Sequence, residues 1–239
     1  MNDRLAGAFQ PRAPLTRAGL RTPRAAAAAG IIFSVLLIWS LWLLRSSIPA
    51  EGDDNSAWIG ERARQLSLAL NLVPFAGVAF IWFLGVLRDR LGAKEDQFFA
   101  TVFLGSGLMF LGMIFVAAAA TVGLSRGYAR ASGAALDPGN YNFARGFIQA
   151  VMRIYAFKMA AVFMVTTSTL ALYIQFTPRW IALLGYPAAA FLLFGSTYVD
   201  WALFVFPCWV LVVSLDILIE NPQRPVQSEP ILGGNGDGR

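Results

Sequence analysis

The stretch AAAAAGIIFSVLLIWSLWLL, residues 25–44, lies between Arg24 and Arg45 and contains no charged residue. A helix of this length measures about 30 Å, which is the thickness of the hydrocarbon core of a bilayer. The stretch therefore predicts a transmembrane helix. The alternative is a cleaved signal peptide, because secretion also uses a basic region followed by an apolar core, but that core is usually only about 7–15 residues long.

The chain continues with further apolar runs of similar length. Residues 66–87 and 98–124 carry no charge, and a third run extends from beyond Lys158 to Phe176. Each of these runs is long enough to cross the hydrocarbon core as a helix. They predict the second, third and fourth transmembrane helices.

The stretch between Arg179 and Asp216 contains a single charged residue, Asp200. One straight helix over this stretch would measure about 54 Å, nearly twice the thickness of the core. It must therefore form two helices, from about Trp180 to Phe194 or Tyr198 and over about 201–219, joined by a tight turn. The sequence thus predicts an all-α polytopic membrane protein, a bundle of six transmembrane helices.

The composition excludes a soluble globular protein and several chemistries. Hydrophobic residues make up 57% of the 239 residues and charged residues 14%, whereas soluble domains have roughly 45–50% and 25%. The chain has no histidine, which excludes a histidine general base and histidine ligation of haem or zinc. Its one cysteine, Cys208, can form neither an intramolecular disulfide nor a four-thiolate metal site. We predict no catalytic residue, no metal, no cofactor and no enzymatic activity.

The apolar runs divide the chain into three parts. A transmembrane domain, 25–220, follows a basic tail, 1–24, which we expect to be disordered, and precedes a flexible tail, 221–239, rich in glycine and proline. The net charge is +5, and we expect the excess basic residues to lie in loops that face the cytoplasm, not on a surface that binds nucleic acid. The bias of arginine over lysine favours a bacterial source.

The basic residues also set an expected orientation. Five arginines precede the first helix, and Arg88, Arg90 and Lys94 lie in the short connection after the second. Short basic loops stay on the cytoplasmic side of a membrane. We therefore expect a multi-pass protein of the plasma membrane with both termini in the cytoplasm.

The longest predicted connection is 125–144, and Asp137-Pro138-Gly139-Asn140 in it is a strong turn signal. After it, Arg145, Gln149 and Arg153 recur every four residues and share one helical face. This helix either lies in the headgroup region or is the outer end of the fourth transmembrane helix. We favour the second interpretation, in which one long helix is bent or tilted.

Small and hydroxyl residues mark two helices. Gly105, Gly112 and Ala119 line one face of the third, where we expect close packing against another helix of the same subunit; the alternative is a dimer interface. The hydroxyls of residues 166–169 could line a polar path, but they bond more often to the carbonyl four residues earlier. Pro187 and Pro207 are expected to bend the last two helices, and Cys208, beside the second bend, to be buried.

Few ionisable residues lie near the membrane, and we expect them to pair. Asp200 and Asp216 lie about 24 Å apart along the last helix, toward opposite faces of the membrane. An unpaired charge at such depth costs a few kcal/mol on insertion scales. Asp200 is predicted to pair with Lys158 or Arg153, and Asp216 with one of the inner basic residues, Arg88, Arg90 or Arg179.

Residues 85–94, Gly-Val-Leu-Arg-Asp-Arg-Leu-Gly-Ala-Lys, resemble the G-x-x-x-D-R-x-G-x-K loop motif of the major facilitator superfamily. The resemblance covers this loop alone. It implies that Asp89 and Arg90 form an intracellular latch between helices and that the protein transports a solute. Residues 99–107, 178–186 and 206–214 also resemble, weakly, those of uncharacterised bacterial integral membrane proteins, for which no activity is implied.

Two functions remain open from the sequence. One is a structural or interaction component of the membrane, whose partners are the lipid bilayer and either another membrane protein or a second copy. The other is a small solute or ion transporter or a channel subunit. A continuous polar cavity reaching the middle of the membrane would favour transport, and a dry, packed interior would favour the first function.

Overall fold

The computed structural model describes residues 22–47, 58–91, 97–131, 136–174, 177–196 and 198–219, and all elements in these ranges are helical. The tails 1–21 and 220–239 lie outside the described residues, and so do the loops 48–57 and 92–96. The elements are α1 (Thr22–Ser47), α2 (Trp58–Glu61), α3 (Ala63–Leu91), α4 (Gln97–Arg130), α5 (Pro138–Ala150), a π-helical segment (Val151–Ala156), α6 (Phe157–Ile174), α7 (Arg179–Phe194) and α8 (Ala202–Ile219).

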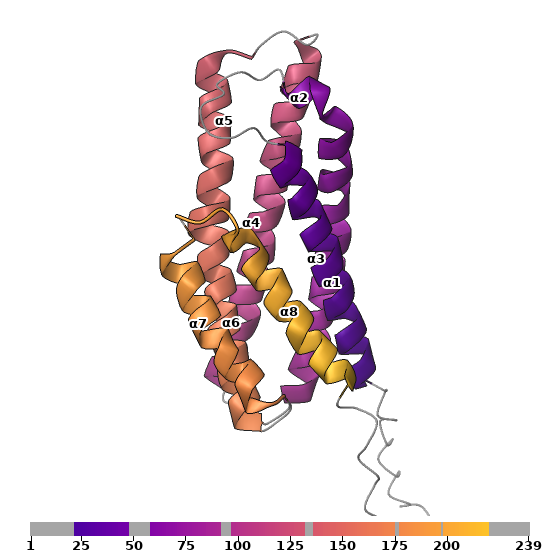
Figure 1. The fold of residues 1–239 in the computed structure, drawn as a ribbon, viewed down its shortest axis with the longest axis vertical. Helices are drawn as coiled ribbons and strands as arrows, with labels where there is room; N and C mark the ends of the chain where they lie inside the picture. Colours follow the sequence, from indigo (N-terminus) through magenta and orange to yellow (C-terminus); the bar gives the residue numbers. More distant parts are fainter. Residues whose placement is uncertain are drawn as a thin grey trace, which may run out of the picture.

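The helices run alternately up and down the bundle, and the described chain begins and ends at the same end, the lower one in Figure 1. In the described part of the chain, α1, α3, α4, the long α5–α6 helix and α8 are long and apolar enough to cross a membrane. A sixth apolar helix, α7, is shorter, with 16 residues. The predicted all-α bundle of six apolar helices is confirmed.

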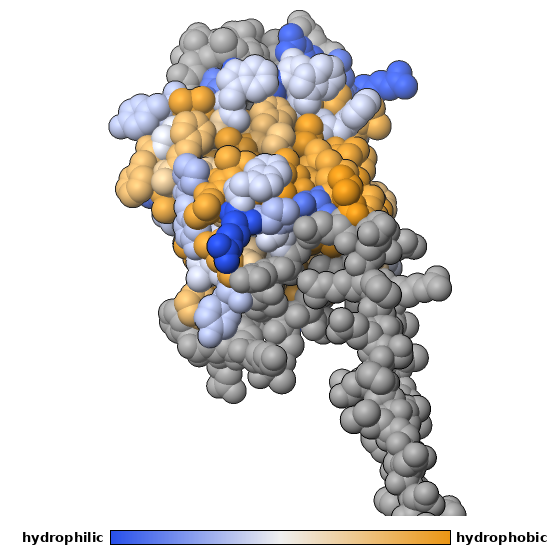
Figure 2. Space-filling model, turned by 60° about the horizontal axis from the view of Figure 1, so that its bottom comes forward, coloured by the Kyte–Doolittle hydropathy of each residue, from blue (hydrophilic) through white to orange (hydrophobic). Residues whose placement is uncertain are grey.

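Exposed apolar side chains cover much of the outside of the bundle (Figure 2). Trp39, Phe75, Trp82 and Tyr173 are each more than half exposed. Such a surface would drive a soluble monomer to aggregate, whereas it suits contact with lipid chains. Helix length and surface together indicate an integral membrane protein.

The helices differ greatly in length, and this difference shapes the upper half of the molecule. Helix α4 has 34 residues and measures about 51 Å, whereas α8 has 18 and measures about 27 Å. Figure 1 shows the connection between α7 and α8 at mid-height, with α4 and α5 continuing above it. Above Ala202, therefore, α8 no longer fills the space between α1 and α5.

The expected long connection 125–144 is wrong, because most of it is helical. Helix α4 continues to Arg130, and α5 begins at Pro138. Asp137 caps α5, and its side chain accepts a hydrogen bond from the backbone N–H of Asn140 at 3.2 Å. Residues 137–140, predicted to form a turn, are therefore the start of a helix. Proline is tolerated in the first helical turn because an N–H there would have no partner within the helix.

The fourth membrane segment is one continuous helix, as predicted. Residues 138–174 pass from α5 through the π-helical segment to α6 without a break. The segment Pro138–Tyr173 counts as one membrane span. It begins at the upper end of the bundle, well above the level of α8 (Figure 1).

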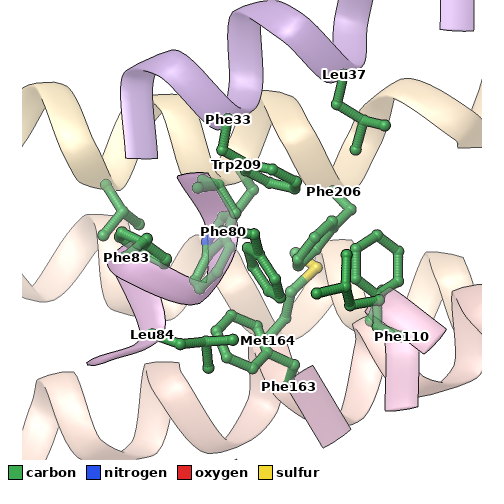
Figure 3. Close-up of a cluster of buried hydrophobic side chains, with 14 of the residues drawn as sticks. Phe33, Leu37, Phe80, Phe83, Leu84, Phe110, Phe163, Met164, Phe206 and Trp209 are labelled. Atoms are coloured by element: carbon green, nitrogen blue, oxygen red, sulfur yellow. The ribbon is translucent and has the colours of Figure 1, made fainter. Parts of the chain in front are cut away.

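A cluster of phenylalanines fills the middle of the bundle (Figure 3). We call the fully buried set from α1, α3, α4, α6 and α8 the phenylalanine cluster: Phe33, Phe80, Phe83, Phe103, Phe110, Phe163 and Phe206. The ring centroids lie 4.6 Å apart for Phe33 and Phe80 and 4.5 Å apart for Phe110 and Phe206. These are the offset contact distances that aromatic rings prefer. The interior at this level is filled by packed aromatic side chains.

Close helix contacts form at glycines other than those expected. A Cβ on Gly30 of α1 would lie 2.0 Å from Ser214 Oγ of α8, and one on Gly185 of α7 would lie 1.9 Å from Ser168 Oγ of α6. By contrast, no described atom lies within 4 Å of a Cβ placed on Gly105 or Gly112. The expected packing of that stripe within the subunit is wrong, because α4 turns Phe103 and Phe110 inward and these glycines outward.

The remaining local predictions have mixed outcomes. The hydroxyls of Thr166, Thr167 and Thr169 donate to the carbonyls four residues earlier, at 2.7–2.9 Å, as expected.

Cys208 is exposed, so its predicted burial is wrong. Its neighbours Pro207 and Trp209 face the core, and Cys208 lies on the outward side of α8.

We predict that Gly185→Ala lowers the free energy of unfolding in detergent by about 1–3 kcal/mol, because the added methyl overlaps Ser168 Oγ. Ser168→Ala should restore most of this loss, since that hydroxyl has no hydrogen-bond partner among the described residues. The matched control is Gly112→Ala, which has open space and should be neutral or stabilising. Equal losses for the two glycine variants in an unfolding titration would contradict the contact.

Candidate ligand cavity

A cavity of about 660 Å³ lies above the start of α8. Its walls come from the upper parts of α1, α3, α4 and α5, from the π-helical segment, and from residues 198–203 at the α7–α8 connection. Its position follows from the short α8, which begins at Ala202, so that the cavity lies between α1 and α5 with α3 and α4 in its wall. The volume lies within the roughly 300–1,000 Å³ typical of ligand pockets.

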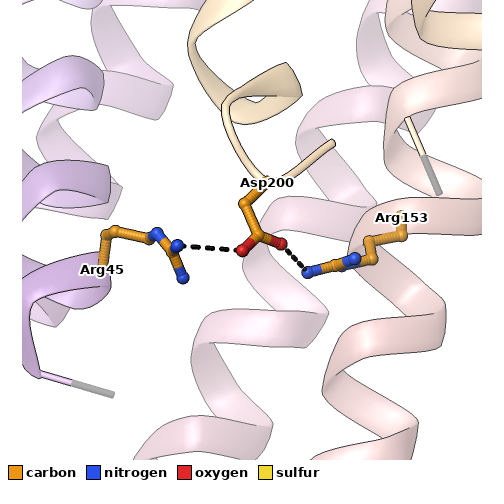
Figure 4. A network of polar contacts seen from close by, with 3 residues as sticks. All are labelled: Arg45, Arg153 and Asp200. Atoms are coloured by element: carbon orange, nitrogen blue, oxygen red, sulfur yellow. Dashed lines mark hydrogen bonds and ion pairs between the residues drawn. The ribbon is translucent and has the colours of Figure 1, made fainter. Parts of the chain in front are cut away.

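Asp200 joins three parts of the chain at the edge of this cavity (Figure 4). Its two carboxylate oxygens lie 2.8 Å from Arg45 Nη2 of α1 and 2.6 Å from Arg153 Nη2 of the π-helical segment. The side chains are part-exposed, with 28% for Arg153, 40% for Asp200 and 45% for Arg45. We call these three residues the Asp200 bridge.

The polar face of the fourth membrane segment points into the same cavity. Arg145, Gln149 and Arg153, which the sequence places on one helical face, all line it. Arg145 and Gln149 are half-buried, and neither has a hydrogen bond or an ion pair within the described part of the chain. The described lining thus holds three arginines and one carboxylate, so this described part of the lining carries an excess of positive charge.

The lower part of the cavity is apolar and closed. Leu37 of α1, Ile114 of α4 and Leu203 of α8 lie at its lower side. The next helical turn below each of them carries a member of the phenylalanine cluster: Phe33, Phe110 and Phe206. The cavity therefore ends on the packed aromatic core, and no polar path leads from it toward the lower end in the described structure.

The two aliphatic hydroxyls in the wall are already bonded. Ser40 Oγ donates to the carbonyl of Ala69 at 2.8 Å, which links α1 to α3. Thr121 Oγ1 donates to the carbonyl of Ala117 at 2.8 Å. The groups left to meet a ligand are therefore the charged side chains, Gln149, the polar ends of Tyr198 and Trp201, and the apolar wall.

The structure places the predicted polar residues in different surroundings. The expected pair of Asp200 with Arg153 is present, whereas Lys158 is exposed and forms no ion pair with a described residue. Arg153 lines the cavity but Lys158, five residues later, does not. Sequence reasoning missed Arg45, which lies at the upper end of the first helix and contacts Asp200 only because α1 and the α7–α8 connection become neighbours.

Asp216 forms no ion pair with Arg88 or Arg179, two of the three basic residues expected as its partner, in the described structure. It accepts a hydrogen bond from Thr177 Oγ1 at 2.5 Å. The third expected partner, Arg90, lies outside the described side chains, so that pairing stays a prediction. The connection before α7 brings Thr177, a buried hydroxyl, to this carboxylate. The side chains of Asp89 and Arg90 lie outside the described residues, so the latch of the loop motif stays a prediction.

Two further results bear on function. Among the described residues, no group of three or more acidic, cysteine or histidine side chains could hold a metal ion. A comparison of the chain with family models, with curated proteins and with solved structures finds no match. The function must therefore be argued from the cavity.

We predict that Arg153 and Asp200 are energetically coupled. Arg153→Gln and Asp200→Asn should each lower stability, and the double variant should lose less than the sum by about 0.5–1 kcal/mol, a small value because both side chains are part-exposed. Lys158→Gln is the control and should be additive with Asp200→Asn. Additivity in both cycles, measured by unfolding in detergent, would mean that the bridge contributes nothing.

Proposed function

We propose that the protein is an interaction component of the bacterial plasma membrane that binds a ligand in its upper cavity, with both termini in the cytoplasm. The observation that carries the proposal is a cavity with a charged rim, an apolar lower wall and a closed end. Such a combination of apolar wall and few polar groups is characteristic of ligand sites. Ionisable residues on membrane-spanning helices are also candidates for a functional site by default.

The closed end argues against a channel. Conduction needs a path that admits water or ions through the whole thickness of the membrane. The fully buried phenylalanine cluster lies across the middle of the bundle, and the Thr hydroxyls of α6 bond to their own helix. These features support binding over passive passage.

A transporter is the second candidate, because a cavity open at one end and closed at the other also describes one state of alternating access. The loop motif at residues 85–94 favours it. If solute uptake into liposomes occurred and depended on Asp89, transport would replace ligand binding as the proposed function. Binding without uptake supports the first candidate.

The orientation can be tested by labelling with a membrane-impermeant maleimide. We expect Asn142→Cys, at the exposed upper end of α5, to react in intact cells, in a Cys208→Ser background that removes the one native thiol. Cys208 itself lies in the middle of α8, facing outward, and should react slowly because lipid disfavours the thiolate. Reaction of the introduced thiol only after lysis would reverse the orientation.

Two neighbouring alanines of α4 test the cavity itself. Ala118 lines it and Ala119 faces outward, so Ala118→Trp should fill the cavity whereas Ala119→Trp should leave it open. We expect lipid-derived molecules that co-purify with the wild type, seen by native mass spectrometry, to be lost from the first variant and kept by the second. Equal occupancy in both variants would overturn the proposed function.

A further inference from the structure

We propose that the ligand of this cavity is an anionic amphiphile from the membrane, with a phosphate or carboxylate headgroup beside Arg45, Arg145 and Arg153 and a hydrocarbon tail on the apolar wall below. The inference rests on the proposed function and names the class of molecule that the cavity takes.

The charge of the rim selects the headgroup. Among the described lining residues, Asp200 is the only acidic one, whereas three are arginines, and two of these, Arg45 and Arg153, pair with it. Arg145 is half-buried as a residue and has no partner in the described structure, and a charge that loses water without gaining a counter-ion is unfavourable. Arginine binds phosphate and carboxylate through paired hydrogen bonds. An anion at the rim would balance the excess charge.

The lower wall selects the tail. From Arg45 down to Leu37, the wall of α1 extends about 12 Å, and three of its cavity-lining side chains are leucines. The apolar side chains of Val73, Ile114 and Leu203 face the same space. A free inorganic anion would leave this wall without contact, whereas a hydrocarbon chain would cover it. The headgroup and tail of one amphiphile match both halves of the cavity.

The place of the cavity gives the ligand a route from the bilayer. The rim residues Arg45, Arg153 and Asp200 are part-exposed, so the cavity opens to the surface of the described structure at their level. This opening lies at the upper end of the apolar α8, near the level where lipid headgroups meet the hydrocarbon core. An amphiphile in the upper leaflet could therefore enter sideways, with its headgroup already at the depth of the arginines.

Asp200 already occupies part of this anion site. Its carboxylate contacts Arg45 and Arg153 as the headgroup of a ligand would. The incoming headgroup therefore competes with Asp200 for these two arginines, and its binding releases the α7–α8 connection from α1. Asp200→Asn keeps the shape of the side chain and removes the competing charge, so it should strengthen binding.

The experiment uses the full chain in phosphatidylcholine nanodiscs, with binding followed by isothermal calorimetry. The probes are dodecyl phosphate, dodecyl maltoside, which has the same tail and no charge, and inorganic phosphate, which has no tail. We expect dodecyl phosphate to bind and the other two to bind at least about tenfold more weakly. The Ala118→Trp variant, in which the cavity is filled, gives the background heat that arises when a probe partitions into the lipid of the nanodisc.

Variants of the rim complete the test. Arg145→Gln should weaken the binding of dodecyl phosphate about tenfold, and Asp200→Asn should strengthen it several-fold. Arg130→Gln, an exposed arginine at the same end that does not line the cavity, is the matched control and should change nothing.

Each contrary outcome has a separate meaning. Equal binding of dodecyl maltoside, unchanged by Arg145→Gln, would overturn the anionic class and leave the ligand cavity standing. Equal binding of inorganic phosphate would overturn the amphiphile in favour of a soluble anion. Binding of every probe unaffected by Ala118→Trp would remove the cavity as a site and, with it, the proposed function.

Discussion

Helix α8 has 18 residues and α4 has 34, and the upper half of the molecule is arranged around that difference. Within a bilayer the backbone must stay helical, because exposed amide groups find no water there. Helix α8 can therefore end only near the edge of the hydrocarbon core, and its end fixes the height of Asp200. The cavity, its charged rim and its open side all follow from the level at which this helix stops.

Packing below the cavity is of a different kind. In lipid, association of helices gains little from the hydrophobic effect, so close fit and dispersion must hold them together. The interlocked rings of the phenylalanine cluster and the glycine contacts at Gly30 and Gly185 provide that fit. A rigid lower half thus carries an upper half in which charged side chains, rather than close packing, join the helices.

The sequence predicted the positions of the helices well, but it predicted poorly which side of each helix faces the core and which faces lipid. Charge-free runs fix length, so the six apolar helices and the single long helix through Arg153 were predictable, as was the shared face of Arg145, Gln149 and Arg153. Which way Cys208 and Gly112 point was not, because lipid and protein core are equally apolar and leave no hydrophobic stripe to read. Arg45 was missed because its nearness to Asp200 depends on which helices become neighbours, a tertiary property.

The Asp200 bridge also has a meaning for the order of assembly. Asp200 is made roughly 155 residues after Arg45, and at about 5–20 residues per second the ribosome needs roughly 8–30 s to reach it. During that time the apolar face of α1 can rest against lipid at little cost, but the guanidinium group must stay in the hydrated headgroup layer. Arrival of the last hairpin then gives Arg45 its carboxylate partner, and the ion pair joins the first-made helix to the last.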